Sequence, residues 1–241
     1  MQKHDDFPEM TAPNVWPSEK LLPGFRATFE ELCNLVIDTA VFVARACDRF
    51  AEENIVGYEK GCLERVIKGS QLNKARMLHY FPLLKDMETM SPQKETENIW
   101  CTTHVDHGCL TGLTSALYID EAANPPLVPR DCTSSLPALP TLSASPDPDT
   151  GLYIRSRTSE LVKVSIPPDC LGFQTGEALE LMTKGKFKAV PHLVKSGRPG
   201  AGKVARNTLA VFTQPNLNEV VDTESGLTFG AFSRIVAERF Q

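Results

Sequence analysis

From about residue 73 onward, this sequence consists of short segments with the alternating or β-branched character of strands, and this pattern constrains the fold most. Turn signals separate several of these segments, among them Pro167-Pro168 and the glycines from Gly200 to Gly202. We expect strands at residues 74–80, 98–105, 111–119, 151–155, 160–166, 170–175, 187–195 and 204–214. Short strands divided by such turns predict an antiparallel jelly roll.

The part of the sequence before these segments has a helical pattern. Residues 26–53 carry apolar side chains at the spacing of one helical face, for example at Val36 and Ala40. A shorter helix is expected at 58–69 and a closing helix at 228–240. The chain is therefore predicted to be an α+β protein, with a double-stranded β-helix (jelly roll) backed by an N-terminal helical layer.

The same patterns predict how the chain is divided. Residues 1–72 form a lead-in and the helical layer, residues 73–220 the double-stranded β-helix core, and residues 221–241 the C-terminal helix. Residues 121–150 are rich in Pro, Ser, Thr and Asp and lack periodicity, so they predict a loop insertion in the core. Such an insertion is either a solvated loop or a lid over a site.

Composition and charge exclude several classes of function. The formal net charge is −5 and no basic tract is present, which argues against nucleic-acid binding. The seven cysteines are odd in number and form no Cys-x-x-Cys pair, so reduced thiols are expected rather than disulfides or a zinc site. No segment approaches the ~20 apolar residues of a membrane span, and the first residues lack the apolar run of a signal peptide. We expect a cytoplasmic monomer without a membrane partner.

The segment from Thr103 to Gly108 contains two possible metal ligands. Residues i and i+2 of a strand face the same side, so His104 and Asp106 would aim an imidazole and a carboxylate at one point. His192 is the best second histidine in the sequence. Two histidines and one carboxylate suit Fe(II) with open positions better than they suit zinc. The alternative interpretation is a histidine near a strand end that bonds a neighbouring acid.

A second polar pair, Arg206 and Thr208, follows downstream of His192. These residues are again i and i+2, so a guanidinium fork and a hydroxyl share one face of a strand and form a receptor for a carboxylate. A dicarboxylate could chelate the metal at one end and meet Arg206 at the other. Taken alone, Arg206 would be interpreted as a surface arginine paired with an acid.

Together these motifs resemble the isopenicillin N synthase-like branch of the 2-oxoglutarate/Fe(II)-dependent oxygenase superfamily. The family pattern reads His-x-Asp, Gly-x-Leu-Thr, Gly-Leu at the start of a strand, Gly-(Asp/Glu)-x-Leu before a glycine turn, then His and finally Arg-x-Ser. Every element has a counterpart here, in order, within about residues 74–215. The matching segments are HVDHGCLTGLTSALYID (104–120), TGLYIRSRTSELVKVSIPPDCLGFQTGEALELMTKGKFKAVPHLV (150–194) and RNTLAVFTQP (206–215).

The resemblance implies a function and roles for these residues. It implies that His104, Asp106 and His192 ligate Fe(II), and that Arg206 and Thr208 hold the distal carboxylate of 2-oxoglutarate. Threonine in place of the family's serine keeps the hydroxyl. The implied enzyme is an Fe(II)- and 2-oxoglutarate-dependent dioxygenase, an oxidoreductase that uses dioxygen to hydroxylate, desaturate or cyclise a small organic molecule.

The strand ahead of His-x-Asp departs from the family pattern. Family members usually have an Asn-Tyr-Tyr-Pro-like stretch, whereas this chain has His79-Tyr80-Phe81-Pro82. His79 takes the place of the asparagine as a third cofactor-binding candidate, Phe81 lacks the phenol, and Tyr80 is expected to point to the opposite face. This departure motivates an alternative, an Fe(II) oxidase that does not use 2-oxoglutarate. The lack of the family's early Ile-Pro-x-Ile-Asp-like strand motivates another, a non-catalytic jelly-roll binding protein.

Overall fold

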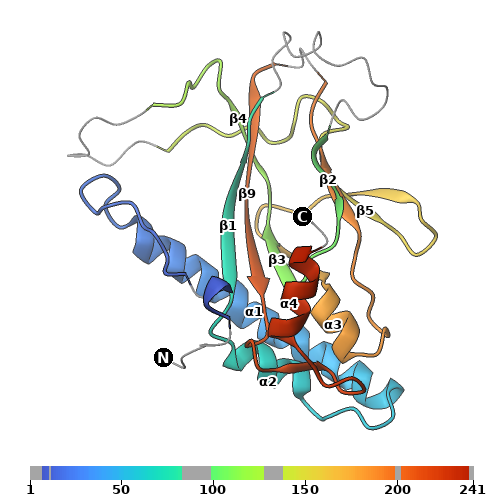
Figure 1. Ribbon diagram of the computed structural model, residues 1–241. Helices are drawn as coiled ribbons and strands as arrows, with labels where there is room; N and C mark the ends of the chain where they lie inside the picture. Colours follow the sequence, from blue (N-terminus) through green and yellow to red (C-terminus); the bar gives the residue numbers. More distant parts are fainter. Residues whose placement is uncertain (1–6, 11, 83–98, 128–137, 199–201, 239–241) are drawn as a thin grey trace.

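The computed structural model describes residues 7–10, 12–82, 99–127, 138–198 and 202–238, which form antiparallel sheets with helices around them (Figure 1). The helices are η1 (Pro8–Met10), α1 (Phe25–Asn54), α2 (Cys62–Gly69), α3 (Glu177–Met182) and α4 (Phe229–Glu238). The strands are β1 (Lys74–Tyr80), β2 (Ile99–His104), β3 (Leu110–Thr114), β4 (Leu117–Asp120), β5 (Gly151–Arg155), β6 (Leu161–Val164), β7 (Leu171–Thr175), β8 (His192–Lys195), β9 (Val204–Thr213), β10 (Val220–Asp222) and β11 (Leu227–Thr228). None of the described helices combines the length and the apolar character that crossing a membrane requires.

Two sheets make up the β part of the molecule. The larger sheet has the strand order β1-β9-β3-β7, and β4 pairs with β9 beyond the end of β3. The smaller sheet has the order β2-β8-β5-β6, and β10 pairs with β11 in a separate ribbon. All of these pairings are antiparallel, as predicted for a jelly roll. Side chains connect the two sheets, for example Tyr80 on β1 with Trp100 on β2, whose ring centroids lie 5.3 Å apart.

Helix α1 packs against one face of the larger sheet. Val36 of α1 is buried with Leu209 and Val211 of β9. Gly112 of β3 permits this close approach, because an added Cβ there would lie 2.3 Å from Val36 Cγ1. Successive residues of a strand alternate between faces, so the even-numbered residues of β9 point away from α1. We call the face that carries these residues (Arg206, Thr208, Ala210 and Phe212) the inner face.

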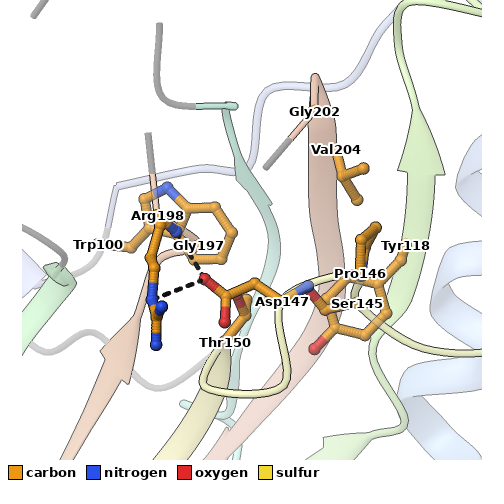
Figure 2. Close-up of a pocket in the computed structure, with 10 residues that line it drawn as sticks. All are labelled: Trp100, Tyr118, Ser145, Pro146, Asp147, Thr150, Gly197, Arg198, Gly202 and Val204. Atoms are coloured by element: carbon orange, nitrogen blue, oxygen red, sulfur yellow. Dashed lines mark hydrogen bonds and ion pairs between the residues drawn. The ribbon is translucent and has the colours of Figure 1, made fainter. Parts of the chain in front are cut away.

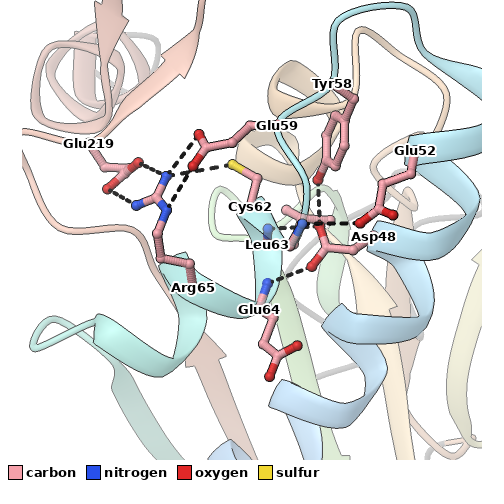
Figure 3. A network of polar contacts seen from close by, with 10 residues as sticks. Asp48, Glu52, Tyr58, Glu59, Cys62, Leu63, Glu64, Arg65 and Glu219 are labelled. Atoms are coloured by element: carbon pink, nitrogen blue, oxygen red, sulfur yellow. Dashed lines mark hydrogen bonds and ion pairs between the residues drawn. The ribbon is translucent and has the colours of Figure 1, made fainter.

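A buried carboxylate joins α1 to α2. Helix α2 follows Gly61, which offers no capping side chain, and Asp48 of α1 supplies the missing acceptor. Asp48 accepts hydrogen bonds from the backbone amides of Leu63 (2.9 Å) and Glu64 (2.8 Å) and from the hydroxyl of Tyr58 (2.7 Å) (Figure 3). Burial and the bond to Asp48 raise the pKa of Tyr58. One side chain thus satisfies donors that the first turn of a helix leaves free.

Part of the 121–150 insertion is attached to the strand ends. Asp147 is buried, and its Oδ2 accepts a hydrogen bond from the amide of Arg198 at 2.8 Å (Figure 2). The amide of Leu142 donates to the carbonyl of Tyr118. With Trp100 and Tyr118, this segment lines a small cavity of about 20 Å³. The prediction of a loop without regular strands therefore fits residues 121–127 and 138–150, whereas residues 128–137 lie outside the described part.

Two of the expected strands differ from the structure. The expected strand 111–119 is two strands, β3 and β4, which pair with successive parts of β9. The expected strand 187–195 begins only at His192, because the residues after α3 form turns, in which the carboxylate of Glu180 accepts a hydrogen bond from the amide of Ala189. The two short strands β10 and β11 were not expected at all. Strands of two or three residues carry too little periodicity to be recognised.

Replacing Asp48 with alanine should lower the free energy of unfolding by about 3 kcal/mol. Two backbone amides and a hydroxyl lose their acceptor, and an unsatisfied buried donor costs ~1–3 kcal/mol. Asp38→Ala is the matched control, because Asp38 is exposed on the same helix, and it should change stability by less than about 0.5 kcal/mol. Urea denaturation followed by circular dichroism measures both variants. Equal stability of the two would contradict the role of Asp48.

Candidate functional site

The three residues predicted to bind a metal lie together in the structure. Ligand atoms of His104, Asp106 and His192 all lie within 4.8 Å of one another. His104 ends β2, His192 begins β8, and the two are direct partners across these strands, with ring centroids 4.2 Å apart. Asp106 Oδ1 is 3.9 Å from His192 Nε2. Residues from two strands and one loop thus form a compact group of two imidazoles and a carboxylate.

The position of Asp106 has a different cause from the one that the sequence pattern suggested. Strand β2 ends at His104, so Asp106 lies in a loop and does not share a strand face with it. The first amides of α3 hold this loop. The amide of Glu177 donates to the carbonyl of Asp106 at 2.8 Å, and the amide of Ala178 donates to the carbonyl of Gly108 at 3.1 Å. The free amides at the start of a helix therefore fix the loop that carries the carboxylate.

Glycine at two positions makes this contact possible. A Cβ added at Gly176 would lie 2.4 Å from the carbonyl oxygen of Gly108 and 2.8 Å from that of Asp106. A Cβ added at Gly108 would lie 2.5 Å from the carbonyl oxygen of Thr213. These neighbours are backbone atoms, which cannot move aside as a flexible side chain can. Glycine at position 176, directly before α3, is therefore required for the start of this helix to approach the loop.

The two histidines are oriented in the same way. Nδ1 of His104 donates to the carbonyl of Thr102 at 2.8 Å, and Nδ1 of His192 donates to the carbonyl of Val190 at 3.0 Å. A carbonyl oxygen only accepts hydrogen bonds, so Nδ1 carries the proton in both rings. This leaves Nε2 of each ring as the nitrogen that can coordinate a metal, with its orientation held by a backbone partner.

The surroundings shift the pKa values of the two histidines in opposite directions. Cys101 Sγ lies 3.6 Å from His104 Nδ1, and this contact together with the bond to Thr102 raises the pKa of His104 to about 9. Burial lowers the pKa of His192, which is therefore neutral near pH 7. A metal ion would have to displace a proton from His104 and none from His192.

Two residues that were not identified from the sequence hold the Asp106 carboxylate. Thr111 Oγ1 and Gln174 Nε2 each donate to Asp106 Oδ2 at 2.6 Å. Thr111 on β3 and Gln174 on β7 are direct partners across the larger sheet, and both are buried. Their bonds occupy Oδ2, while Oδ1 lies toward His192. The signal for Thr111 was available, because it is the threonine that ends the Gly-x-Leu-Thr stretch Gly108-Cys109-Leu110-Thr111.

Arg206 is a buried cation without a counter-ion among the described residues. It is 6% exposed, and its Nε and Nη1 have no hydrogen-bond partner there. Its partners across the sheet are Tyr80 on β1 and Tyr118 on β4, and its Cζ lies 5.3 Å from the Tyr80 ring centroid. Thr208 shares the inner face, where its hydroxyl donates to the carbonyl of Thr114 at 3.2 Å. A buried, unpaired guanidinium is costly unless an anion joins it.

His79 does not lie with Arg206, which corrects its assignment as a cofactor-binding residue. Its Nδ1 lies 2.6 Å from Asn207 Oδ1, and its Nε2 lies 3.2 Å from Glu121. Asn207 follows Arg206 and points to the opposite face of β9. Tyr80, expected to point away, is the residue that faces Arg206. The register of β1 on β9 decides this, and the register was not visible in the sequence.

Removing one donor to Asp106 should weaken metal binding. Thr111→Val keeps the shape of the side chain but loses the hydroxyl, whereas Thr111→Ser keeps the hydroxyl. We expect Co(II), used as a probe, to bind the valine variant about 10-fold more weakly, since residues that orient metal ligands contribute roughly 10–100-fold. The serine variant should bind within about threefold of the unmodified chain. Isothermal titration calorimetry gives the affinities, and equal values for valine and serine would refute this role of the hydroxyl.

No protein-family model and no curated protein matches this sequence. Solved structures do match. A putative 2OG-Fe(II) oxygenase family protein from Caulobacter crescentus has a TM-score of 0.67 at 18% identity, covering 100% of this chain and 67% of that one. A putative oxygenase from Shewanella oneidensis has a TM-score of 0.60 at 16% identity, covering 95% and 69%. A full-length protein of Neurospora crassa, solved in complex with alpha-KG, has a TM-score of 0.59 at 19% identity, covering 89% and 54%.

The chain thus spans between about half and two thirds of the length of these proteins. The matches extend over nearly all of this chain, and they agree with the two antiparallel sheets described above. This chain therefore has the jelly-roll fold of the 2-oxoglutarate/Fe(II) oxygenases.

Proposed function

We propose that this chain is an Fe(II)- and 2-oxoglutarate-dependent dioxygenase that hydroxylates, desaturates or cyclises a small organic molecule. The observation that carries the proposal is the group of His104, Asp106 and His192, whose ligand atoms lie within 4.8 Å of one another. The buried Arg206, with donors free on the inner face, supports the use of an anionic co-substrate. The fold has been described in proteins of this class, which adds support by analogy.

The donor set fits Fe(II). Two imidazoles and one carboxylate form a three-ligand group that leaves positions open, as non-haem Fe(II) oxygenases require. Nε2 of His104, Nε2 of His192 and Oδ1 of Asp106 would hold the ion. When bound, the iron would supply the activation of dioxygen. The chain's own contribution is to fix the ligands, through the Nδ1 bonds of the two histidines and the bonds to Asp106 Oδ2.

The surroundings of Arg206 fit the distal carboxylate of 2-oxoglutarate. A carboxylate would accept hydrogen bonds from Nε and Nη1, the two atoms that have no partner among the described residues. Tyr80 and Tyr118 flank the guanidinium and exclude water from it. Thr208 lies on the same face as a second candidate. This combination favours 2-oxoglutarate over the alternative of an oxidase that does not use it. Phe81 lacks the hydroxyl of the family's tyrosine, but the hydroxyl-bearing side chains of Tyr80 and Tyr118 flank Arg206 instead.

Several finer assignments accompany this proposal. We infer that α1 and α2 form the helical layer behind the jelly roll, and that the chain divides into residues 1–72, 73–220 and 221–241. The motif order favours the isopenicillin N synthase-like branch. A small-molecule partner follows from the proposed chemistry, whereas the monomeric state and the cytoplasmic location stay predictions. The convergence of three ligand residues also disfavours a purely non-catalytic binding protein.

Turnover of 2-oxoglutarate tests the proposal directly. With Fe(II) and dioxygen, the chain should convert 2-oxoglutarate to succinate slowly even without a substrate. His192→Ala removes one ligand and should reduce succinate formation to the background of metal-free protein. Asp38→Ala, on the exposed side of α1, should retain the activity. Metal binding without any succinate, across a broad panel of added small molecules, would refute the use of 2-oxoglutarate.

Arg206→Leu separates the co-substrate from the metal. Adding 2-oxoglutarate to the anaerobic Fe(II) protein should produce a metal-to-ligand charge-transfer band. In the variant, 2-oxoglutarate should bind roughly 10–100-fold more weakly, because hydrogen bonds to a charged group contribute about 1.5–3 kcal/mol. Without ligand, the variant should be no less stable, since it removes an unpaired buried charge. An unchanged affinity for 2-oxoglutarate would rule out Arg206 as its receptor.

A further inference from the structure

Two exposed cations on β1 lie on the inner face. Lys74 is the partner of Phe212 across β1 and β9, and Arg76 is the partner of Ala210. The Cζ of Arg76 lies 5.6 Å from the centroid of the Phe212 ring. Within the described ranges, no acidic group lies at ion-pair distance from either cation. Strand β1 is at the edge of its sheet, so this guanidinium is accessible to a molecule arriving from solvent.

Phe212 connects these cations to the candidate metal centre. It is the direct partner of Thr111 across β9 and β3. Thr111 in turn donates the 2.6 Å hydrogen bond to Asp106 Oδ2. Side chains of partner residues in an antiparallel sheet lie side by side on one face. Arg76, Phe212 and Thr111 are therefore successive neighbours on the inner face, and Thr111 contacts the Asp106 carboxylate.

Arg76 and Arg206 share the inner face but differ in their surroundings. Arg206 is opposite Tyr80, which lies four residues along β1 from Arg76, or about 13 Å at ~3.3 Å per residue. Arg206 is buried between aromatic residues, as suits a co-substrate held deep in the molecule. Arg76 is exposed and lies over Phe212, the cross-strand partner of Thr111, which holds Asp106. The two guanidinium groups can therefore bind different anions at the same time.

We propose that Arg76, whose guanidinium lies over the Phe212 ring, binds the carboxylate of the organic substrate, which would make the substrate a small carboxylic acid. This rests on the proposed function and adds a substrate class to it. A guanidinium that stacks on a ring keeps its edge donors free, and its planar fork matches a carboxylate with two parallel hydrogen bonds. Phe212 then provides an apolar surface for the carbon skeleton, next to the residues that position Asp106. Lys74 adds a second positive charge at the same edge.

Matched probes test the proposal without knowledge of the natural substrate. Phenylacetate, cyclohexanecarboxylate and octanoate are compared with their primary amides. Phenyl phosphate and octyl phosphate test whether the site prefers a phosphate to a carboxylate. Ligand-observed NMR and titration calorimetry give affinities for the metal-free chain and for the anaerobic chain with Fe(II) and 2-oxoglutarate. At least one carboxylate should bind 10-fold or more tightly than its amide.

Arg76→Gln should weaken the binding of that carboxylate about 10-fold or more, because the variant loses a charge-assisted pair of hydrogen bonds. The affinity for the matching amide should not change. The carboxylate affinity of Arg76→Lys should lie between those of the unmodified chain and Arg76→Gln, since lysine keeps the charge but not the planar pair of donors. Arg157→Gln is the matched control, an exposed arginine in the β5–β6 turn, and it should bind like the unmodified chain. Thermal melting of each variant shows whether it is folded.

The outcomes separate this inference from the proposed function. Carboxylate discrimination that depends on Arg76, without a charge-transfer band on adding 2-oxoglutarate, would support the site and refute the proposed function. A charge-transfer band on adding 2-oxoglutarate, without tighter binding of any carboxylate than of its amide, would overturn the Arg76 site and leave the proposed function unaffected. Equal binding by Arg76→Gln and Arg157→Gln would overturn the role of Arg76. Tighter, Arg76-dependent binding of the phosphates would overturn the assignment of a carboxylic acid.

Discussion

The candidate centre depends on the contact between the loop carrying Asp106 and the start of α3. The loop continues from β2 of the smaller sheet, whereas α3 follows β7 of the larger sheet. The amide of Glu177 holds the carbonyl of Asp106, and Gly176 and Gly108 permit the two backbones to approach. This contact therefore links the two sheets at the point where Asp106, His192 and Gln174 meet. A side chain at either glycine would separate them.

Local patterns placed both histidines on strands, and in the structure His104 ends β2 while His192 begins β8. The same reasoning selected Asp106, which does lie beside them, but for the wrong reason, since strand β2 ends at His104. His79 shows the limit of local patterns. Alternation places residues 79 and 80 on opposite faces, but only the pairing of Tyr80 with Arg206 decides which of them is on the inner face. That pairing joins segments far apart in the sequence.

Thr111 and Gln174 illustrate the second limit. Each is a single polar residue within a strand; Gln174 has no local partner in sequence that would mark it as part of a site, and Thr111 is marked only as the last residue of the Gly-x-Leu-Thr stretch. Their role comes from direct pairing of β3 with β7 and from a carboxylate carried by a third segment. A motif such as Gly-x-Leu-Thr can draw attention to the strand that carries one of these residues. The geometry that gives the motif its purpose arises only when the three segments meet.

The unsatisfied polar atoms of the described residues are consistent with a polar ligand near Arg206. Among the described residues, buried side-chain atoms without a hydrogen-bond partner occur at Arg206, Thr150 and Ser196. Thr150 lines the small cavity together with Tyr118, which is the cross-strand partner of Arg206 (Figure 2). Unpaired buried polar groups are rare because each one reduces stability. An anion that pairs with Arg206 removes that cost only in the bound state, so its binding should stabilise the folded chain by mass action.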